Sequence, residues 1–252
     1  ERAMSHDVTS ILSEWPYEPQ NTIRVVTADD GREVMQLRLP LGIEQYELEG
    51  RPDGRHPDGH GSYLDLVEAN AARYIEGHGS DLGFHIDHDD AVELHNEGLL
   101  YYYRYLLLFQ INDYRRVIQD TEHNLRLCRV LERYAGDDED RNAVLQFRPY
   151  ILRMNAVAKA MAMLHGELAG SPAKVIEEAI DSINEMEEIE SPAFQLEKVR
   201  SINYLKSTLQ QVAESPEGEG EAERLRRELD RAVQEENYER AAQLRDRLNS
   251  LG

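Results

Sequence analysis

The sequence predicts a mainly α protein: an antiparallel helical bundle, preceded by a small N-terminal antiparallel β-sheet and followed by a C-terminal helical hairpin. Three observations lead to this fold class. Alternation of apolar and polar residues, which is typical of a half-buried strand, occurs only before about residue 60. From about residue 62 to 213, apolar residues instead recur every three or four positions, as on the buried face of a helix. The same helical spacing returns in two short segments near the C-terminus.

The N-terminal part contains strand signals on both sides of a turn. Residues 23–27 and 34–41 are rich in apolar residues, and Ala28–Gly31 between them suits a hairpin turn. Alternation in the second strand predicts one buried face, with Leu41 among its members. The alternation changes phase after Gly42, so we expect a turn or bulge and then a third short strand.

The middle of the chain contains start signals for a series of helices. Ser62, Asp113 and Ser171 are candidate N-caps, and Pro172 and Pro192 each stand in a first helical turn. The expected helices cover approximately residues 62–75, 90–111, 113–135, 141–168, 171–189 and 191–212, with a kink at Pro149.

Two features of these helices resemble the helix-turn-helix units of tetratricopeptide-like (TPR-like) repeats. They are the turn at Asn112–Tyr114 and the pair of helices that begin with proline. No regular 34-residue period can be laid over the segment. Stacked antiparallel helices are therefore the expected arrangement of the TPR-like hairpins.

The chain is expected to have four parts. A linker rich in glutamate, glycine and proline cannot bury apolar surface, so we expect it to be flexible. The predicted parts are an N-terminal segment with a small sheet (1–60), an α-helical body (61–214), this acidic linker (215–221) and a helical hairpin (222–252).

Charge restricts the classes of partner. The 252 residues include 49 Asp and Glu against 28 Lys and Arg, a formal charge of -21. Such an excess repels a phosphate backbone, and the arginines between 224 and 231 alternate with acidic residues. No direct nucleic-acid binding is therefore expected.

The chain is also expected to be cytoplasmic, without a membrane partner. Residues 1–15 lack the basic flank and apolar run of a signal peptide. The longest apolar run, 98–111, is too short for a membrane span and is interrupted by Arg104. The single cysteine, Cys128, lies on the apolar stripe of a predicted helix, where we expect a buried hydrophobic side chain and no nucleophile.

The C-terminal hairpin has the clearest functional implication. Its apolar residues define two short amphipathic helices, and Asn237 is the expected N-cap of the second. Because so small a hairpin buries little surface, we expect it to need a partner protein. The residues expected to bind that partner are Leu225, Leu229, Ala232, Val233, Glu236, Asn237, Tyr238, Ala241, Ala242, Leu244, Arg245 and Leu248.

This hairpin closely resembles the UVR motif, the tail module shared by the UvrB and UvrC repair proteins, some AAA+ protease unfoldases and activators of protein arginine kinases. The resemblance implies a protein-contact element and says little about chemistry. Trp15–Pro19, Asp30–Glu33 and Gly50–Gly54, taken together with the tail, resemble a family of bacterial UVR-motif proteins of uncharacterised function. That family implies an architecture and no known reaction.

One cluster of side chains is a candidate metal site. Histidine and carboxylate side chains suit zinc, iron or manganese, and several of them lie between residues 85 and 95. The alternative is a polar loop and helix start whose carboxylates complement the helix dipole, and this alternative is preferred. The candidate metal ligands are His85, Asp87, His88, Glu93 and His95.

Common catalytic signatures are absent from the sequence. It contains no P-loop, no Cys-x-x-Cys pair and no serine nucleophile elbow. We therefore expect a non-enzymatic adaptor or scaffold without a cofactor, which docks through its hairpin onto another protein or onto a second copy of itself. Two alternatives remain open: a metal-dependent enzyme or metal sensor that uses the 85–95 cluster, and an accessory factor of nucleotide-excision repair that acts through protein contacts.

Overall fold

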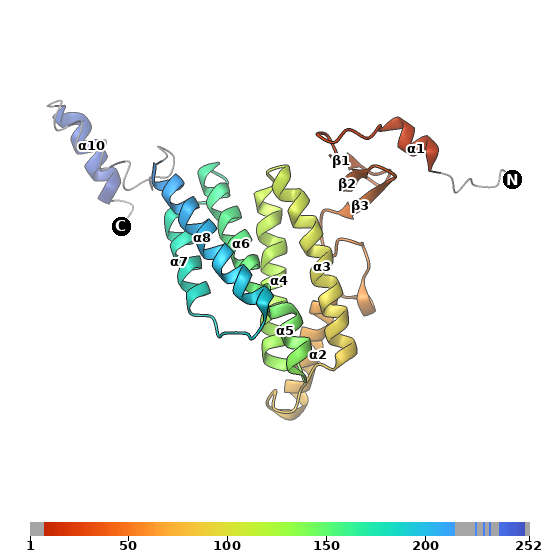
Figure 1. The fold of residues 1–252 in the computed structure, drawn as a ribbon. Helices are drawn as coiled ribbons and strands as arrows, with labels where there is room; N and C mark the ends of the chain where they lie inside the picture. Colours follow the sequence, from red (N-terminus) through yellow and green to blue (C-terminus); the bar gives the residue numbers. More distant parts are fainter. Residues whose placement is uncertain (1–7, 215–224, 226–228, 230–231, 233–236, 250–252) are drawn as a thin grey trace. The chain divides into compact units, whose positions relative to one another are not determined.

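The computed structural model describes residues 8–214, 225, 229, 232 and 237–249, and the chain divides into two compact units. Unit 1 comprises residues 1–145 and unit 2 comprises residues 146–252. The described residues are mainly helical, with one small antiparallel sheet, which confirms the predicted fold class. Figure 1 shows the elements along the chain. No helix in this described part combines the length and the apolar character that crossing a membrane requires.

Unit 1 begins with a short helix and the sheet, and continues with helices. Its elements are α1 (Thr9–Glu14), β1 (Ile23–Thr27), β2 (Glu33–Leu39), β3 (Gly42–Glu47), the 3-10 turn η1 (Pro57–Gly59), α2 (Tyr63–His78), α3 (His88–Gln110), α4 (Tyr114–Tyr134) and α5 (Asp138–Leu145).

The sheet has the strand order β1-β2-β3, and both pairs of strands are antiparallel. The predicted turn closes with a hydrogen bond of 2.8 Å from the Ala28 N–H to the Arg32 carbonyl, and Gly31 adopts a φ of 88°. The alternation changes phase where a tight turn connects β2 to β3. The expectation that Leu41 is buried is wrong: it lies in that connection and is 91% exposed, because the strand ends two residues earlier.

Three helices of unit 1 begin at side-chain N-caps. The Ser62 hydroxyl and the Asp87 and Asp113 carboxylates each accept a hydrogen bond of 3.0–3.2 Å from the amide three residues later. The first and third of these caps were predicted. The Ile86 N–H donates to the Tyr134 carbonyl at 2.7 Å, which ties the start of α3 to the end of α4. These two helices therefore run antiparallel, side by side (Figure 1).

The core of unit 1 lies mainly between α3 and α4. Leu94, Tyr105 and Leu108 from α3 are fully buried, as are Leu127 and Leu131 from α4. Cys128 is also fully buried, as its place on the apolar stripe predicts.

Unit 2 contains three helices that pack on one another, α6 (Arg148–Leu164), α7 (Pro172–Asn184) and α8 (Pro192–Glu214). Ser171 caps α7, with 3.4 Å between its hydroxyl and the Lys174 amide. The kink expected at Pro149 is instead a break between α5 and α6, and Pro149 stands in the first turn of α6, where its missing N–H costs nothing. Ile176, Ile183, Phe194 and Leu205 form the fully buried centre. The likeness to tetratricopeptide repeats stays a prediction.

Candidate functional site

The C-terminal hairpin is closed upon its own apolar residues. Leu225 and Ala232 from its first half pack with Ala241 and Leu244 from its second half, and all four are at most 9% exposed. Leu229 and Leu248 pack against this cluster and are partly buried.

The second helix of the hairpin, α10 (Tyr238–Asn249), begins at the predicted cap. The Asn237 side-chain oxygen accepts a hydrogen bond of 3.3 Å from the Arg240 amide, and the Asn237 carbonyl accepts one of 3.0 Å from the Ala241 amide. Val233 and Glu236, both predicted to bind a partner, lie outside the described residues, and only the backbone of Tyr238 is described.

The exposed residues described on α10 are polar, and three of them are arginines. Arg240, Arg245 and Arg247 are exposed, and Arg245 lies 3.2 Å from Asp246, whose side chain is also exposed. Arg240 and Arg247 are seven residues apart and therefore lie on one side of α10. The predicted partner-binding set thus divides: its described leucines and Ala232 and Ala241 form the hairpin core, and Asn237 and Arg245 face outward.

The candidate metal ligands of unit 1 have separate local roles. Asp87 caps α3, and His85 Nδ1 lies 3.3 Å from the Gly83 carbonyl oxygen. His88 Nδ1 lies 2.8 Å from the Asp140 carboxylate, and this hydrogen bond raises the pKa of His88. Glu93 and His95 follow on α3. Within the described ranges, histidine, cysteine and carboxylate side chains form no group of three or more arranged to hold a metal ion.

The metal site accordingly stays a prediction. Metal analysis of protein purified without an affinity tag tests it, and a content well below one equivalent would remove it. The preferred alternative, a polar helix start, agrees with the role of Asp87 as a cap.

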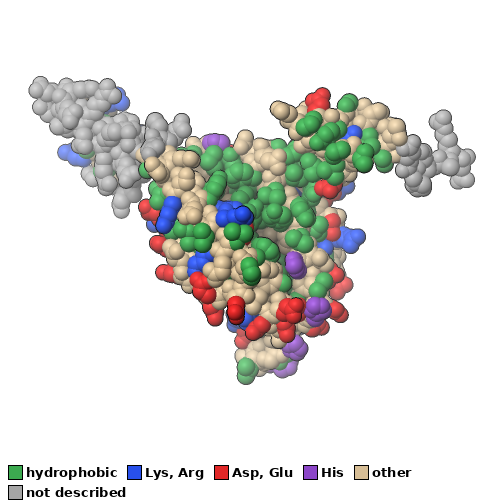
Figure 2. All heavy atoms as spheres, viewed as in Figure 1, with side chains coloured by type: hydrophobic (Ala, Val, Ile, Leu, Met, Phe, Trp, Pro, Cys, Tyr) green, Lys and Arg blue, Asp and Glu red, His purple; other side chains and the backbone are tan. Residues whose placement is uncertain are grey.

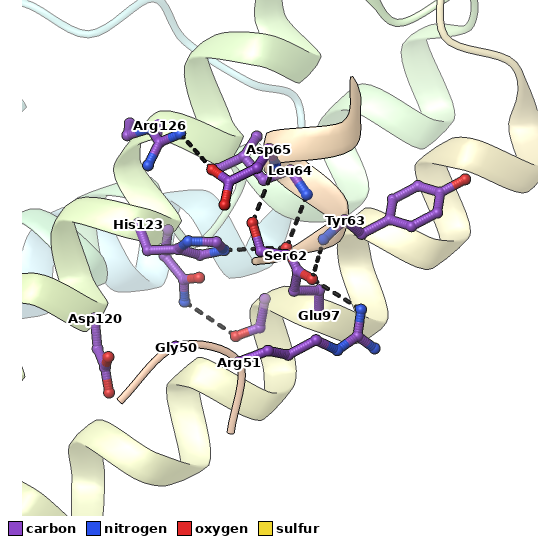
Figure 3. A network of polar contacts seen from close by, with 12 residues as sticks. Gly50, Arg51, Ser62, Tyr63, Leu64, Asp65, Glu97, Asp120, His123 and Arg126 are labelled. Carbon is purple, nitrogen blue, oxygen red and sulfur yellow. Dashed lines mark hydrogen bonds and ion pairs between the residues drawn. The ribbon is translucent and has the colours of Figure 1, made fainter. Parts of the chain in front are cut away.

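A buried carboxylate outside every predicted site joins three segments of unit 1 (Figure 3). Glu97 on α3 is fully buried. Its Oε2 accepts hydrogen bonds from Arg51 Nη1 at 2.9 Å and from the Tyr63 amide at 2.6 Å. Its Oε1 accepts one from the Leu64 amide at 3.0 Å and lies 3.2 Å from His123 Nε2 on α4. We call these five residues the Glu97 clamp.

The clamp places a negative charge at the start of a helix. Tyr63 and Leu64 provide the first amides of α2, where unpaired N–H groups and the helix dipole favour an anion. The His123 ring stacks on Tyr101 with 3.6 Å between ring centroids, which fixes its orientation toward Glu97. The Glu97 carboxylate therefore accepts hydrogen bonds from the first amides of α2, as a bound anion does at other helix N-termini.

A second buried ion pair lies further along α3. Arg104 is 3% exposed and binds Asp120 of α4 through two parallel hydrogen bonds of 2.9 and 2.5 Å. Its remaining Nη1 donates to the Glu47 and Gly50 carbonyls at 2.7 and 2.8 Å. Arg104 thus fastens the end of β3 and the residues after it to the α3–α4 pair.

The electrostatics of these groups suit structural roles. Burial raises the pKa of Glu97, but hydrogen bonds from His123 and from the Leu64 and Tyr63 amides outweigh burial and lower the pKa overall. Burial raises the pKa of Asp120, against the opposing effect of its hydrogen bond with Arg104. A carboxylate that is fully buried and surrounded by donors has no free position for a substrate, so the Glu97 clamp does not form a catalytic site.

Sequence reasoning missed both ion pairs for a simple reason. Arg51 and Glu97 are 46 residues apart, and the remaining partners of Glu97 are 26 to 34 residues away. The one available signal was that Glu97 and Arg104 are the only charged residues in the apolar stretch 94–111. Charges in such a stretch are buried only when they are paired.

Comparison with known proteins bears on the hairpin alone. Residues 219–252 match the family model described as UVR, the UvrB/uvrC motif. No curated protein and no solved structure matches the chain. The match confirms the motif expected at the C-terminus.

Proposed function

We propose that this protein is a non-enzymatic adaptor that binds a partner protein through its C-terminal UVR hairpin. The observation that carries the proposal is the UvrB/uvrC motif at residues 219–252, together with a hairpin whose described apolar residues pack on one another and whose three described arginines are exposed. A small helical pair of this kind suits recognition of another protein through its exposed side chains.

The distribution of charge supports this role. Residues 222–252 contain seven arginines and seven acidic residues, so the formal charge of -21 resides entirely on the preceding 221 residues. A partner with an acidic surface is repelled by the body of the protein and can approach the hairpin without that penalty. Arg240 and Arg247 are exposed on one side of α10, where an approaching surface would meet them.

Affinity purification from the native host tests the proposal. The full-length chain carrying Arg240→Glu and Arg247→Glu together should lose its specific partners, because both exposed positive charges are reversed while the buried hairpin residues remain. The matched control is Arg129→Glu, an exposed arginine of α4, which should recover the same partners as the unmodified chain.

Deletion of residues 215–252 provides the second arm of this test. It should abolish partner recovery while leaving the helical circular dichroism of the remainder. Recovery of the same partners by the deleted chain would contradict the proposal.

A second candidate function is an accessory role in nucleotide-excision repair through protein contacts. The observation that favours it is the motif itself, whose description refers to UvrB and UvrC. The acidic body disfavours direct contact with DNA. Loss of ultraviolet resistance in a deletion strain, restored by the full chain but not by the Arg240→Glu/Arg247→Glu variant, would support this function. Unchanged resistance would exclude it.

A further inference from the structure

Helix α3 carries a face of uncharged side chains that are exposed or half-buried. The exposed fractions of Val92, Leu99 and Tyr103 are 41%, 39% and 50%, and Leu106 is half-buried. We call the side of α3 on which they lie the outer stripe; it consists of Val92, Asn96, Leu99, Tyr103, Leu106 and Gln110. In Figure 2 hydrophobic side chains gather over the part of α3 that is uppermost in Figure 1, and acidic side chains gather toward its lower end.

The spacing of the outer stripe is that of a helix that packs on another helix. Val92, Leu99 and Leu106 are separated by seven residues, and Asn96, Tyr103 and Gln110 repeat at the same interval between them. Alternating steps of three and four residues keep such a set on one face and define the seam of a helix pair. A single asparagine within such a seam is a device that fixes the register of the two helices.

The stripe also lies in the part of the chain where exposed charge is lowest. Charged residues make up 31% of the chain, yet residues 94–111 contain only Glu97 and Arg104. Both are buried on the opposite side of α3, in the ion pairs described above. Residues 94–110 of this helix therefore contribute no exposed Asp, Glu, Lys or Arg side chain of their own.

We propose that the outer stripe of α3 is a self-association surface, which packs against the same stripe of a second copy of this chain. Two copies that each carry a formal charge of -21 repel one another, and they can meet closely only where neither presents a charge. A two-fold interface brings the same patch of both copies together, so that each contact between two different residues occurs twice. An uncharged seam can pack against itself in this way, because it brings no like charges together.

The lack of charge on the stripe disfavours two other binding partners, a basic protein and the hairpin of the same chain. A basic partner would find no carboxylate on the stripe. The hairpin of the same chain exposes Arg240, Arg245 and Arg247, which would likewise lack a counter-charge there. This surface is separate from the UVR hairpin, so the proposal stands independently of the proposed partner binding.

Sedimentation velocity of the full-length chain tests the proposal over a concentration series. We expect a reversible dimer whose dissociation constant falls when the salt concentration rises from about 50 mM to about 1 M, because salt screens the repulsion between the acidic copies. Association through the arginines of the hairpin would show the opposite dependence. A chain that stays monomeric at about 100 μM in 1 M salt would overturn the proposal.

Substitutions locate the interface. Leu99→Glu should weaken the dimer by about tenfold or more, since it introduces an unpaired charge into the seam. Tyr103→Glu, at a more exposed position, should also weaken the dimer. It tests the interface even if Leu99→Glu impairs folding. The matched control is Leu82→Glu, which makes the same change in charge at a residue that is 86% exposed in the α2–α3 connection, and it should leave the dimer unchanged.

Two results would place the interface elsewhere. If Leu82→Glu weakens the dimer as much as Leu99→Glu, added charge alone is responsible and the stripe is not the interface. If Arg240→Glu/Arg247→Glu dissociates the dimer, the hairpin is the interface. Loss of partner capture by that hairpin variant, with an unchanged dimer, would support both proposals separately.

Discussion

Helices α3 and α7 differ in where their charged residues lie: in the central turns of α3 they are buried, and in α7 they are exposed. In α7 the buried positions are apolar, Ile176 and Ile183 among them, and Glu177 and Asp181 are exposed. The charges of the central part of α3 lie inside unit 1, and its outer stripe is uncharged. In α3, unlike α7, the charged residues of the central turns are paired inside the unit and the exposed residues are uncharged. A helix of this kind can be fastened by polar contacts on one side and remain available for apolar contacts on the other.

The largest expected effect comes from removing the buried carboxylate of α3. Glu97→Gln leaves four donors facing a neutral group, although Asp53 still lies 2.9 Å from Arg51, so we expect the free energy of unfolding to fall by about 3 kcal/mol. Urea denaturation followed by the fluorescence of Trp15, the single tryptophan, measures this in unit 1.

The matched control for Glu97→Gln lies on α7. Glu177 is exposed, and Glu177→Gln should change the unfolding followed by circular dichroism by less than about 0.5 kcal/mol. Equal losses in the two variants would show that the Glu97 clamp contributes no more than a surface charge.

Substitutions at the Arg104–Asp120 ion pair test whether the buried side of α3 can become apolar, as the buried side of α7 is. Arg104→Met leaves the buried Asp120 unpaired and removes the donor to two carbonyls, so we expect a loss of about 3 kcal/mol. Arg104→Met combined with Asp120→Leu should recover part of this loss, because no buried charge is then left uncompensated. A double variant no more stable than Arg104→Met would mean that the carbonyl contacts of Arg104, and not its ion pair, dominate.

The pH dependence of stability is a smaller effect with a definite sign. The folded pKa of Glu97 is lowered, so its contribution is present above the unfolded value of about 4.3 and is lost as the pH falls through the folded value. Asp120 has a raised pKa and acts in the opposite direction, but it is present in both chains when the original is compared with Glu97→Gln. Below about pH 4.5 the original chain should therefore lose stability more steeply than the variant. Parallel curves over this range would contradict the assignment.

The smallest expected effect concerns the contact between α3 and α4. α7 has Ala179 at a buried position, whereas α3 has Gly98, whose added methyl group would lie 3.5 Å from Leu127 and 3.8 Å from Asn124. These are ordinary contact distances, so Gly98→Ala should stabilise the chain by roughly 0.5 kcal/mol through its higher helix propensity. A loss of more than about 1 kcal/mol in thermal or urea unfolding would show that the two helices cannot accommodate the methyl group.

Local signals in the sequence predicted much of the fold. The caps at Ser62, Asp113, Ser171 and Asn237 are local features that involve neighbouring residues, and each is present. The helical spacing likewise predicted α3 to within two residues at each end. Such features depend on chain segments of a few residues, which periodicity and capping rules describe well.

Long-range pairing accounts for most of what could not be predicted. Arg104 appeared only as an interruption of an apolar run, since its partner Asp120 lies on the next helix and two carbonyls that it contacts lie more than 50 residues away. The division after Leu145 has no clear composition change, and Pro149 suggested a kink where the chain breaks. The hairpin, in contrast, was identifiable because its contacts lie within one short segment.

Because Cys128 is buried, the reactivity of its thiol can be used to measure local opening of unit 1. Its thiol is the only one in the sequence and is fully enclosed in unit 1. A reagent in solution can reach the sulfur only when α4 separates locally from its neighbours, so the rate of thiol modification under native conditions measures how often that opening occurs. Partner binding or self-association that restrains α3 would slow the labelling at a single atom, without any introduced probe.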